Sequence, residues 1–211
     1  MSDIVVRDFG RRALAEVWAQ MRQFTDARDA ATPDEVWFVE HPPVFTLGLS
    51  ADRTHVLDAG TIPVVQTDRG GQVTYHGPGQ LVCYVLIDLK RRGFDVRSLV
   101  QALESAVVDT AAGFSVDAYP RRDAPGVYVG GRKLAAVGLR VRRGGSYHGI
   151  AINVKMDLEP FTRINPCGFE NLEVTQLADL CEIGTVARFR ADFEPRLLAT
   201  FDRSSSGRSC K

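Results

Sequence analysis

An uninterrupted apolar segment, Leu81 to Ile87, constrains the fold of this chain more than any other feature. It reads LVCYVLI and includes the β-branched residues Val82, Val85 and Ile87. Such a run is typical of a central strand that is covered on both faces, rather than of an exposed hairpin. We therefore expect this strand to be a rigid platform for the residues next to it.

A glycine-rich polar loop directly precedes that strand. Glycine permits positive φ angles and lets a ligand approach the main chain closely, so glycines alternating with hydrogen-bonding side chains indicate a small-molecule site. A plain double turn is the alternative, but it does not need arginine and histidine beside its glycines. From the residues alone, the class of ligand stays open. The loop contains Gly70, Gly71, Gly77, Gly79 and Pro78, interleaved with Arg69, Gln72, Thr74, Tyr75, His76 and Gln80.

Length and charge limit the classes of protein to which the chain can belong. Its 211 residues can form one large domain or two small ones. The 26 basic and 26 acidic residues cancel, which argues against non-specific nucleic-acid binding, although a local basic patch could still dock an acidic protein. No apolar run approaches the roughly 20 residues of a membrane span, and the N-terminus has no signal-peptide core. We therefore expect a cytoplasmic protein.

The four cysteines show neither CxxC spacing nor clustering with histidine, so we expect no metal site and no disulfide framework. Cys83 lies in the apolar strand and Cys181 near a predicted helix end, where packing is the default role. Cys210 lies in residues 204–211, a polar tail that we expect to be disordered. Cys167 differs because it lies in a loop.

Three segments have the apolar periodicity of helices that pack against a core. The first carries its stripe at Leu14, Val17, Trp18 and Met21. The second begins at Ser98, whose spacing to Gln101 fits a capping box, and Gly113 is a suitable stop. The third extends over 185–201, where Pro195 should kink or interrupt it.

Short β-rich segments lie between the first two helices. EVWFVE from Glu35 and VFTLG from Val44 are separated by a turn, because the consecutive prolines after His41 break a strand. We favour a structural role for His41 over a functional one. A further strand, residues 62–69, leads into the glycine-rich loop.

Residues 132–143 and 146–155 read as a β-hairpin, closed by a two-residue turn at Gly144 and Gly145. Because side chains alternate along a strand, one face of the second strand should carry His148, Ile150, Ile152 and Val154. The other face should leave room for a ligand chain at Gly149 and Ala151.

The same alternation places Lys133 on the inner face of the first strand. It should share that face with Ala135 and Val137, unless a bulge at Gly138 intervenes. A lysine on an apolar face either extends its amine to the strand end or lies in a pocket with a depressed pKa. The sequence leaves both alternatives open.

Cys167 and Lys133 are the candidates for chemistry. A loop cysteine between Pro166 and Gly168 is a nucleophile candidate if a neighbour generates its thiolate. An inward lysine can accept the thiol proton, or the two groups can rest as a thiolate and ammonium pair. Either state activates the sulfur.

Five motifs occur in the order typical of one enzyme family: HPPVFTLG, RGGQVTYHGPGQLVCY, GRKLAAVGLR, YHGIAINV and TRINPCG. Over roughly residues 8–180 they resemble the lipoyl(octanoyl) transferase family, also called lipoate biosynthesis protein B. The resemblance implies a fold shared with biotin and lipoate protein ligases, a single α/β (α+β) domain around a mixed β-sheet flanked by helices. Residues 1–203 would be the octanoyltransferase catalytic domain, and 204–211 the tail.

The resemblance also implies a reaction, in which an octanoyl group passes from octanoyl-acyl carrier protein to a specific lysine of a lipoyl domain. The acceptors would be 2-oxoacid dehydrogenase and glycine cleavage proteins, with no cofactor, metal, nucleic acid or membrane involved. Cys167, in NPCG, would carry the acyl group as a thioester, and Lys133, in GRK, would be the general base and acid. The matching acyl-binding segments are Arg69, Gly70, Gly71, Gln72, Val73, Thr74, Tyr75 and His76, then Ala136, Val137 and Gly138, and Gly149, Ile150 and Ala151.

This chemistry is consistent with the residues. Exchange between two thioesters is nearly isoenergetic and aminolysis of a thioester is downhill, so no ATP is required. Main-chain N–H groups around Cys167 could stabilise the oxyanion. Two rival hypotheses are an ATP-dependent lipoate or biotin ligase, which has no use for a nucleophilic cysteine, and a non-catalytic acyl-binding protein.

Selection of an eight-carbon chain requires a closed site. Each buried methylene contributes about 0.8 kcal/mol, so two extra carbons would favour the longer chain by roughly fifteenfold in an open groove. We therefore predict a tunnel closed at its end by apolar side chains, which rejects longer chains sterically.

Overall fold

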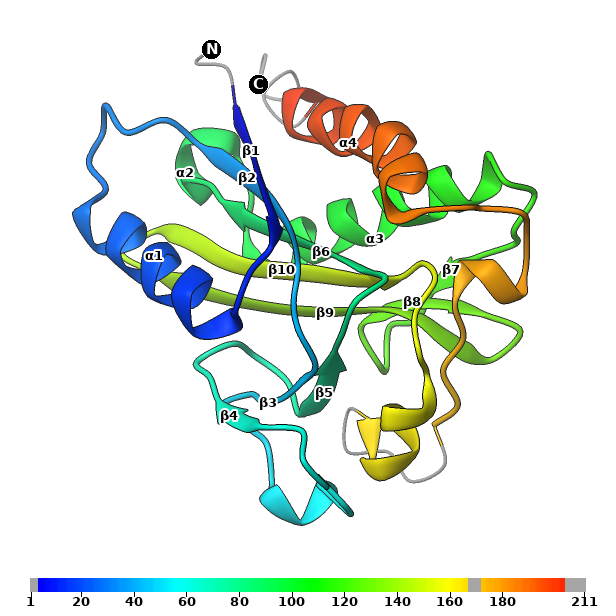
Figure 1. Ribbon diagram of the computed structural model, residues 1–211. Coiled ribbons are helices and arrows are strands. Elements are labelled where there is room, and N and C mark those ends of the chain that lie inside the picture. Colours follow the sequence, from blue (N-terminus) through cyan, green and yellow to red (C-terminus); the bar gives the residue numbers. More distant parts are fainter. Residues whose placement is uncertain (1–3, 167–171, 204–211) are drawn as a thin grey trace.

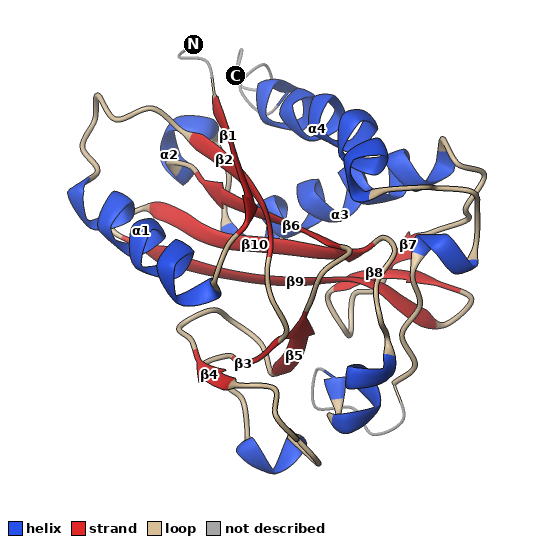
Figure 2. Ribbon diagram, viewed as in Figure 1, coloured by secondary structure: helices blue, strands red, loops and turns tan. Residues whose placement is uncertain are grey.

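The computed structural model describes residues 4–166 and 172–203. Within these ranges a seven-stranded mixed sheet has the order β1-β2-β6-β10-β9-β8-β7 (Figures 1 and 2). The strands are β1 (Val5–Arg11), β2 (Glu35–Glu40), β6 (Gln80–Leu86), β10 (Gly145–Asn153), β9 (Arg132–Arg142), β8 (Gly126–Val129) and β7 (Tyr119–Pro120). β1 and β2 are parallel, and the other neighbours are antiparallel. The predicted mixed sheet is confirmed.

The predicted central strand is β6, which lies between β2 and β10 with all of its residues buried. Because its side chains alternate, Cys83 joins one apolar cluster and Tyr84 joins another on the opposite face. The strand is therefore covered on both faces, as its unbroken apolar sequence predicts.

Two helices cover one face of the sheet: α3 (Val96–Ala112) and α4 (Val186–Arg203) (Figure 1). The buried side chains of α4 that face this core are Phe189, Phe193, Leu197 and Phe201. The helix continues through Pro195, so the predicted interruption is wrong. α3 begins one turn before the predicted position, because Asp95 and Ser98 form its capping box. It ends at Gly113, as predicted.

The opposite face is divided between two smaller units. α1 (Leu14–Ala27) packs on one part of it, next to Trp37 and Tyr147. A three-stranded sheet of β4 (Val64–Gln66), β3 (Val44–Leu47) and β5 (Val73–His76) lies below α1 in Figure 1. A buried cluster around Phe45, Tyr75 and Phe161 joins this small sheet to the 3-10 helix Glu159–Arg163. Other short elements are α2 (Leu89–Arg92) and 3-10 helices at Arg53–His55 and Leu177–Asp179.

The hairpin of β9 and β10 is present, but its turn is shifted by one residue from the prediction. Gly145 pairs with Arg142, so the two turn residues are Arg143 and Gly144. Both have positive φ, 51° and 81°, as a primed two-residue turn requires.

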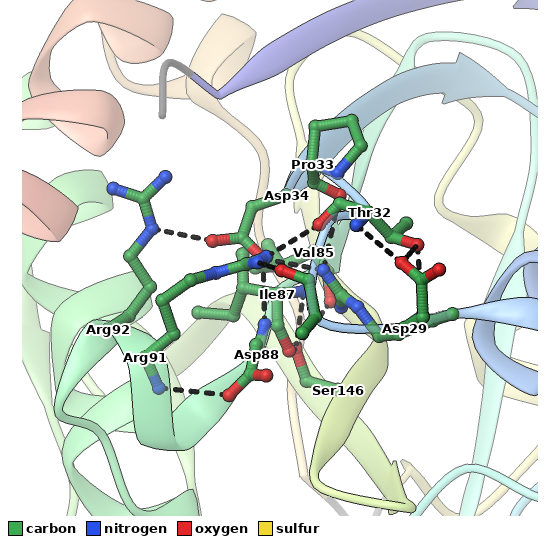
Figure 3. A network of polar contacts seen from close by, with 12 residues as sticks. Asp29, Thr32, Pro33, Asp34, Val85, Ile87, Asp88, Arg91, Arg92 and Ser146 are labelled. Carbon is green, nitrogen blue, oxygen red and sulfur yellow. Dashed lines mark hydrogen bonds and ion pairs between the residues drawn. The ribbon is translucent and has the colours of Figure 1, made fainter. Parts of the chain in front are cut away.

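A buried carboxylate fixes the loop that leads into β2. Asp34 is fully buried and binds Arg28, Arg91 and Arg92 at 2.6, 2.5 and 2.6 Å (Figure 3). It also accepts a hydrogen bond from the main-chain N–H of Asp88. Burial opposes ionisation of Asp34, but the hydrogen bonds from Arg91 and Arg92 outweigh it and lower the pKa of the carboxyl. The cluster therefore joins α1, α2 and the start of β2.

In the part of the chain that the structure describes, no helix combines the length and apolar character needed to cross a membrane.

Candidate functional site

A cavity of about 60 Å³ lies between the large sheet and the loop that precedes β5. Its floor comes from β9 and β10, and one side comes from β6. The predicted acyl-binding residues that line it are Arg69, Gly71, Gln72, Val73, Thr74, His76, Ala136, Val137, Gly138, Gly149, Ile150 and Ala151. Three segments that are distant in sequence therefore meet around one enclosed space.

Gly70 and Tyr75 do not line this cavity. The main-chain N–H of Gly70 donates to the carbonyl of Leu139 at 2.9 Å, so this residue attaches the loop to β9. The Tyr75 ring is buried against Phe45 and Phe161, with centroids 5.5 and 5.4 Å away. These two predicted acyl-binding residues therefore lie outside the cavity lining.

Six further residues line the cavity: Leu14, Thr46, Thr67, Val82, Tyr84 and His148. The sequence contained a usable signal for Val82 and Tyr84, because they lie on the face of β6 opposite Cys83. His148 had none. It has a left-handed φ of 60°, which turns its ring onto the side of Tyr147, where the two rings stack 5.1 Å apart. The predicted shared face of His148 and Ile150 is therefore wrong.

Asp68 binds this displaced histidine. Its carboxylate accepts hydrogen bonds from the His148 ring at 2.9 Å, the Trp18 indole at 2.8 Å and the Tyr147 hydroxyl. Burial opposes ionisation of Asp68, but these donors lower the pKa of the carboxyl below its usual range. Burial also lowers the pKa of His148, against the effect of Asp68. The carboxylate is thus ionised and the imidazole neutral at neutral pH.

A series of hydrogen-bonded, buried polar groups begins at Arg69 in the glycine-rich loop. The Arg69 guanidinium donates to the hydroxyl and carbonyl oxygens of Thr46 at 2.8 and 2.7 Å. The Thr46 hydroxyl lies 3.4 Å from Nε2 of His76. Burial, and then the neighbouring His41, lower the pKa of His76 to about 3. His76 is therefore a neutral part of the cavity wall.

The series continues towards Lys133. Nδ1 of His76 donates to Gln80 at 2.7 Å, and the Gln80 amide donates to Asn153 at 2.9 Å. The Asn153 amide donates to the carbonyl of Thr175 at 3.0 Å, and the N–H of Thr175 donates to the carbonyl of Lys133 at 2.9 Å. Continuous hydrogen bonds thus join the cavity wall to the main chain of Lys133.

Lys133 is 4% exposed, so the predicted inward orientation is confirmed, but the reason for it is different. Lys133 pairs with Tyr128 of β8, and Ala135 pairs with the adjacent Val127, which leaves Leu134 as an extra residue. Leu134 and Ala135 both join the core under α3. Because successive residues of β8 point to opposite faces, this bulge turns Lys133 away from the Ala135 face.

The bulge brings Lys133 to the face that carries Ala136. Its amine lies 5.3 Å from the centroid of the Tyr128 ring, and its side chain passes over Gly126, the partner of Ala136. A Cβ on Gly126 would lie 2.7 Å from Cε of Lys133, so only glycine leaves space there. The amine end therefore lies beside the Ala136 end of the cavity, although Lys133 is not among its lining residues.

Cys167 lies outside the described residues, as do Gly168 and the predicted oxyanion donors. The described residues on either side of it are close to Lys133. Lys133 forms a parallel bridge with Val174 and donates its N–H to the carbonyl of Glu173 at 2.8 Å. A hollow next to this bridge is lined by Pro166, Leu172 and Arg132, among others. Residues 173–175, which are described again after this gap, therefore lie directly beside Lys133.

No group of three or more histidine, cysteine or acidic side chains is arranged to hold a metal ion within the described ranges. His41, for which a structural role was favoured, is fully buried. Its ring bonds the carbonyl of Arg12 and the hydroxyl of Tyr84, each at 2.7 Å. This histidine supports the tyrosine that lines the cavity.

Comparisons with known proteins agree with this geometry. The sequence profile of the lipoyl protein ligase A/B catalytic domain matches residues 13–202. An octanoyltransferase of Alkalilimnicola ehrlichii is 60% identical over 91% of this chain and 89% of that protein. One of Pectobacterium atrosepticum is 54% identical over 94% of this chain and 86% of that protein.

Two solved structures share the fold at low sequence identity. A bipartite lipoate protein ligase of Thermoplasma acidophilum has a TM-score of 0.78 at 16% identity, covering 96% of this chain and 85% of that one. A biotin protein ligase of Aquifex aeolicus has a TM-score of 0.59 at 11% identity, covering 98% and 73%. The predicted likeness to ligase catalytic domains is confirmed for the fold.

Proposed function

This chain belongs to the lipoyl protein ligase A/B catalytic domain family and, within it, to the octanoyltransferases; from that premise we propose how it transfers its acyl group. The enzyme is an acyltransferase. The donor is octanoyl-acyl carrier protein, the carrier of the acyl group on the enzyme is Cys167, and the acceptor is a lysine of a lipoyl domain. The observation that supports this most is Lys133, a buried amine that a strand bulge turns towards the Ala136 end of the cavity.

In the first step the Cys167 thiolate attacks the carbonyl carbon of the donor thioester. A new carbon–sulfur bond forms, the bond to the pantetheine sulfur breaks, and that thiolate leaves with a proton from Lys133. One thioester replaces another, so the step needs no ATP. The octanoyl chain lies in the cavity, whose Ala136 end adjoins Lys133.

In the second step the amine of the acceptor lysine attacks the Cys167 thioester. A carbon–nitrogen bond forms, the carbon–sulfur bond breaks, and the products are an amide and the Cys167 thiolate. Lys133, which gave up its proton in the first step, accepts the proton that the attacking amine loses, so the thiolate and ammonium pair is restored. Lipoyl domains of 2-oxoacid dehydrogenase and glycine cleavage proteins are the proposed acceptors.

Lys133 suits this role because its surroundings hold it in one place. Its main chain bonds Glu173 and Thr175, its amine lies against the Tyr128 ring, and Gly126 leaves space for its stem. A positioned acid–base group typically contributes 10²–10⁴-fold to a rate. A lysine to methionine change should therefore remove roughly that factor from kcat.

The test is intact-mass spectrometry after incubation with octanoyl-acyl carrier protein. The wild-type chain should gain one octanoyl group, mapped to Cys167, without ATP. Cys167→Ser should lose the thioester and nearly all turnover. Cys181→Ser is the matched control, because the Cys181 thiol bonds the carbonyl of Leu177 at 3.4 Å and lines neither the cavity nor the hollow beside Lys133, and this variant should acylate normally.

Other outcomes would support the rival hypotheses. An active Cys167→Ser variant that requires ATP would indicate a ligase. A wild-type chain that binds octanoyl-acyl carrier protein but gains no adduct and transfers nothing would be a binding protein. In Lys133→Met, an unchanged rate of both steps would remove the general base from the mechanism.

A further inference from the structure

The two ends of the cavity are chemically different. Along β10 the cavity extends from Ala151 to His148, and along β9 from Ala136 to Gly138. Lys133 lies beside the Ala136 end. If the proposed octanoyl transfer holds, the reacting carbonyl belongs at that end, and the methyl end of the chain points towards His148.

The main chain of the glycine-rich loop crosses the sheet at the His148 end of the cavity. Gly70 is bonded to the carbonyl of Leu139 at 2.9 Å. A Cβ on Gly138 would lie 3.0 Å from the carbonyl oxygen of Gly70 and 3.2 Å from Cδ of Arg69. The glycine in β9 therefore lets the loop rest directly on the strand, and the loop blocks the cavity there.

Asp68 anchors this crossing segment to two other elements. It accepts from Trp18 of α1 and from Tyr147 and His148 of β10. His148 reaches it with a backbone φ of 60°, a left-handed conformation that is unfavourable for a residue with a side chain. Strain kept at a cavity wall points to a functional constraint.

Distances along the strand can be compared with the length of an acyl chain. Three residues from His148 to Ala151 span roughly 10 Å at about 3.3 Å per residue. An eight-carbon chain has seven carbon–carbon bonds, each about 1.5 Å long, and advances roughly 9 Å when extended. Two more carbons add roughly 2.5 Å, which brings the methyl group onto the histidine and its carboxylate partner.

We propose that His148, held in place by Asp68 together with Trp18 and Tyr147, forms the end wall that sets the acyl chain length accepted by this enzyme. Of these four residues, His148 lines the cavity and the other three support it. The wall combines polar and apolar groups, in contrast to the wholly apolar closure expected from the sequence. The inference rests on the proposed octanoyl transfer. Asp68 itself is a positioning residue, because it acts by holding the loop and the histidine in place.

The support of His148 reaches the protein surface, because the side chain of Asp68 is 26% exposed. Removal of the carboxylate releases the loop, the indole and the imidazole together. A longer chain could then extend past His148 towards water.

The experiment measures kcat/KM for octanoyl- and decanoyl-acyl carrier protein with the full-length chain. In the wild type the decanoyl to octanoyl ratio should be below 1. In Asp68→Ala it should rise at least tenfold, because the longer chain is then no longer excluded. Trp18→Phe and Tyr147→Phe each keep the ring and remove one donor, so each should raise the ratio by a smaller factor.

The ratio of the two kcat/KM values reports specificity and not stability, because both values are measured on the same folded fraction of the enzyme, which cancels. Asp95→Ala, which removes the cap of α3, is the matched control and should leave the ratio unchanged. An unchanged ratio in Asp68→Ala, or in both aromatic variants if Asp68→Ala does not fold, would overturn the proposal. A wild-type enzyme that transfers neither chain would instead remove the proposed function.

Discussion

Two carboxylates, one buried and one partly exposed, bind neighbouring elements together, and they do so with different partners. Asp34 is fully buried and binds the guanidinium groups of Arg28, Arg91 and Arg92. Asp68 is partly exposed and binds an indole, a phenol and a neutral imidazole. Paired charges hold parts of the scaffold together, whereas neutral aromatic donors hold a wall whose shape determines what fits the cavity.

The largest expected effect is the loss of the Asp34 carboxylate. Asp34→Ala removes the carboxylate that three guanidinium groups share, and removing one partner of a buried ion pair typically costs roughly 3–5 kcal/mol. We expect this loss in the free energy of unfolding, measured by urea titration, with the decanoyl to octanoyl ratio unchanged. Asp123→Ala, which breaks the exposed pair with Arg121, should change the free energy of unfolding far less, because solvent screens that pair. A changed acyl preference in Asp34→Ala would contradict the distinction between the two carboxylates.

Acid should destabilise the cavity before it affects the Asp34 cluster. His76 has a pKa of about 3 in the folded protein, against about 6.5 when unfolded. Between these values the unfolded state binds more protons, so stability is complete above about pH 6.5 and falls as the pH decreases towards 3. His41 and His148 change in the same direction.

The loss from His76 should amount to a few kcal/mol over that range. Urea unfolding at a series of pH values measures it. His76→Gln should flatten the dependence between pH 6.5 and 4, where Asp34→Ala should leave it unchanged. Equal flattening by both variants would show that acid sensitivity does not belong to the cavity.

The smallest effect distinguishes the arginines within the Asp34 cluster. The side chain of Arg91 is 27% exposed and that of Arg92 is 4% exposed. Arg91→Ala should cost about 1 kcal/mol or less, because solvent screens its charge and Asp34 keeps two other partners. Arg92→Ala should cost more, because its charge is desolvated. Thermal unfolding of both variants checks the order, and a reversed order would mean that exposure does not decide the contribution.

Much of the fold could be predicted because its signals are local. The apolar run of β6, the stripe of α1 and the Gly113 stop of α3 each depend on a few neighbouring residues. The five motifs also located most of the cavity-lining residues, since these lie within three continuous segments.

What could not be predicted depends on a single backbone angle or on one inserted residue. The bulge at Leu134 leaves no trace in the pattern, because Leu134 to Val137 are all apolar and can be accommodated on either face. His148 follows Tyr147 in an otherwise regular strand, and alternation cannot reveal a positive φ. Asp34 stands beside other polar residues, so its complete burial is decided by arginines from elsewhere in the chain.

The hydrogen bonds that join Lys133 to Glu173 and Thr175 also bear on recognition of the acceptor. They fasten the root of this side chain to a second stretch of backbone, so the amine has little freedom to follow an approaching molecule. In the proposed reaction the acceptor lysine must therefore move to the Lys133 amine, which stays in place. An acceptor protein that displays its lysine on a narrow projection would reach it, whereas one with a flat surface would not.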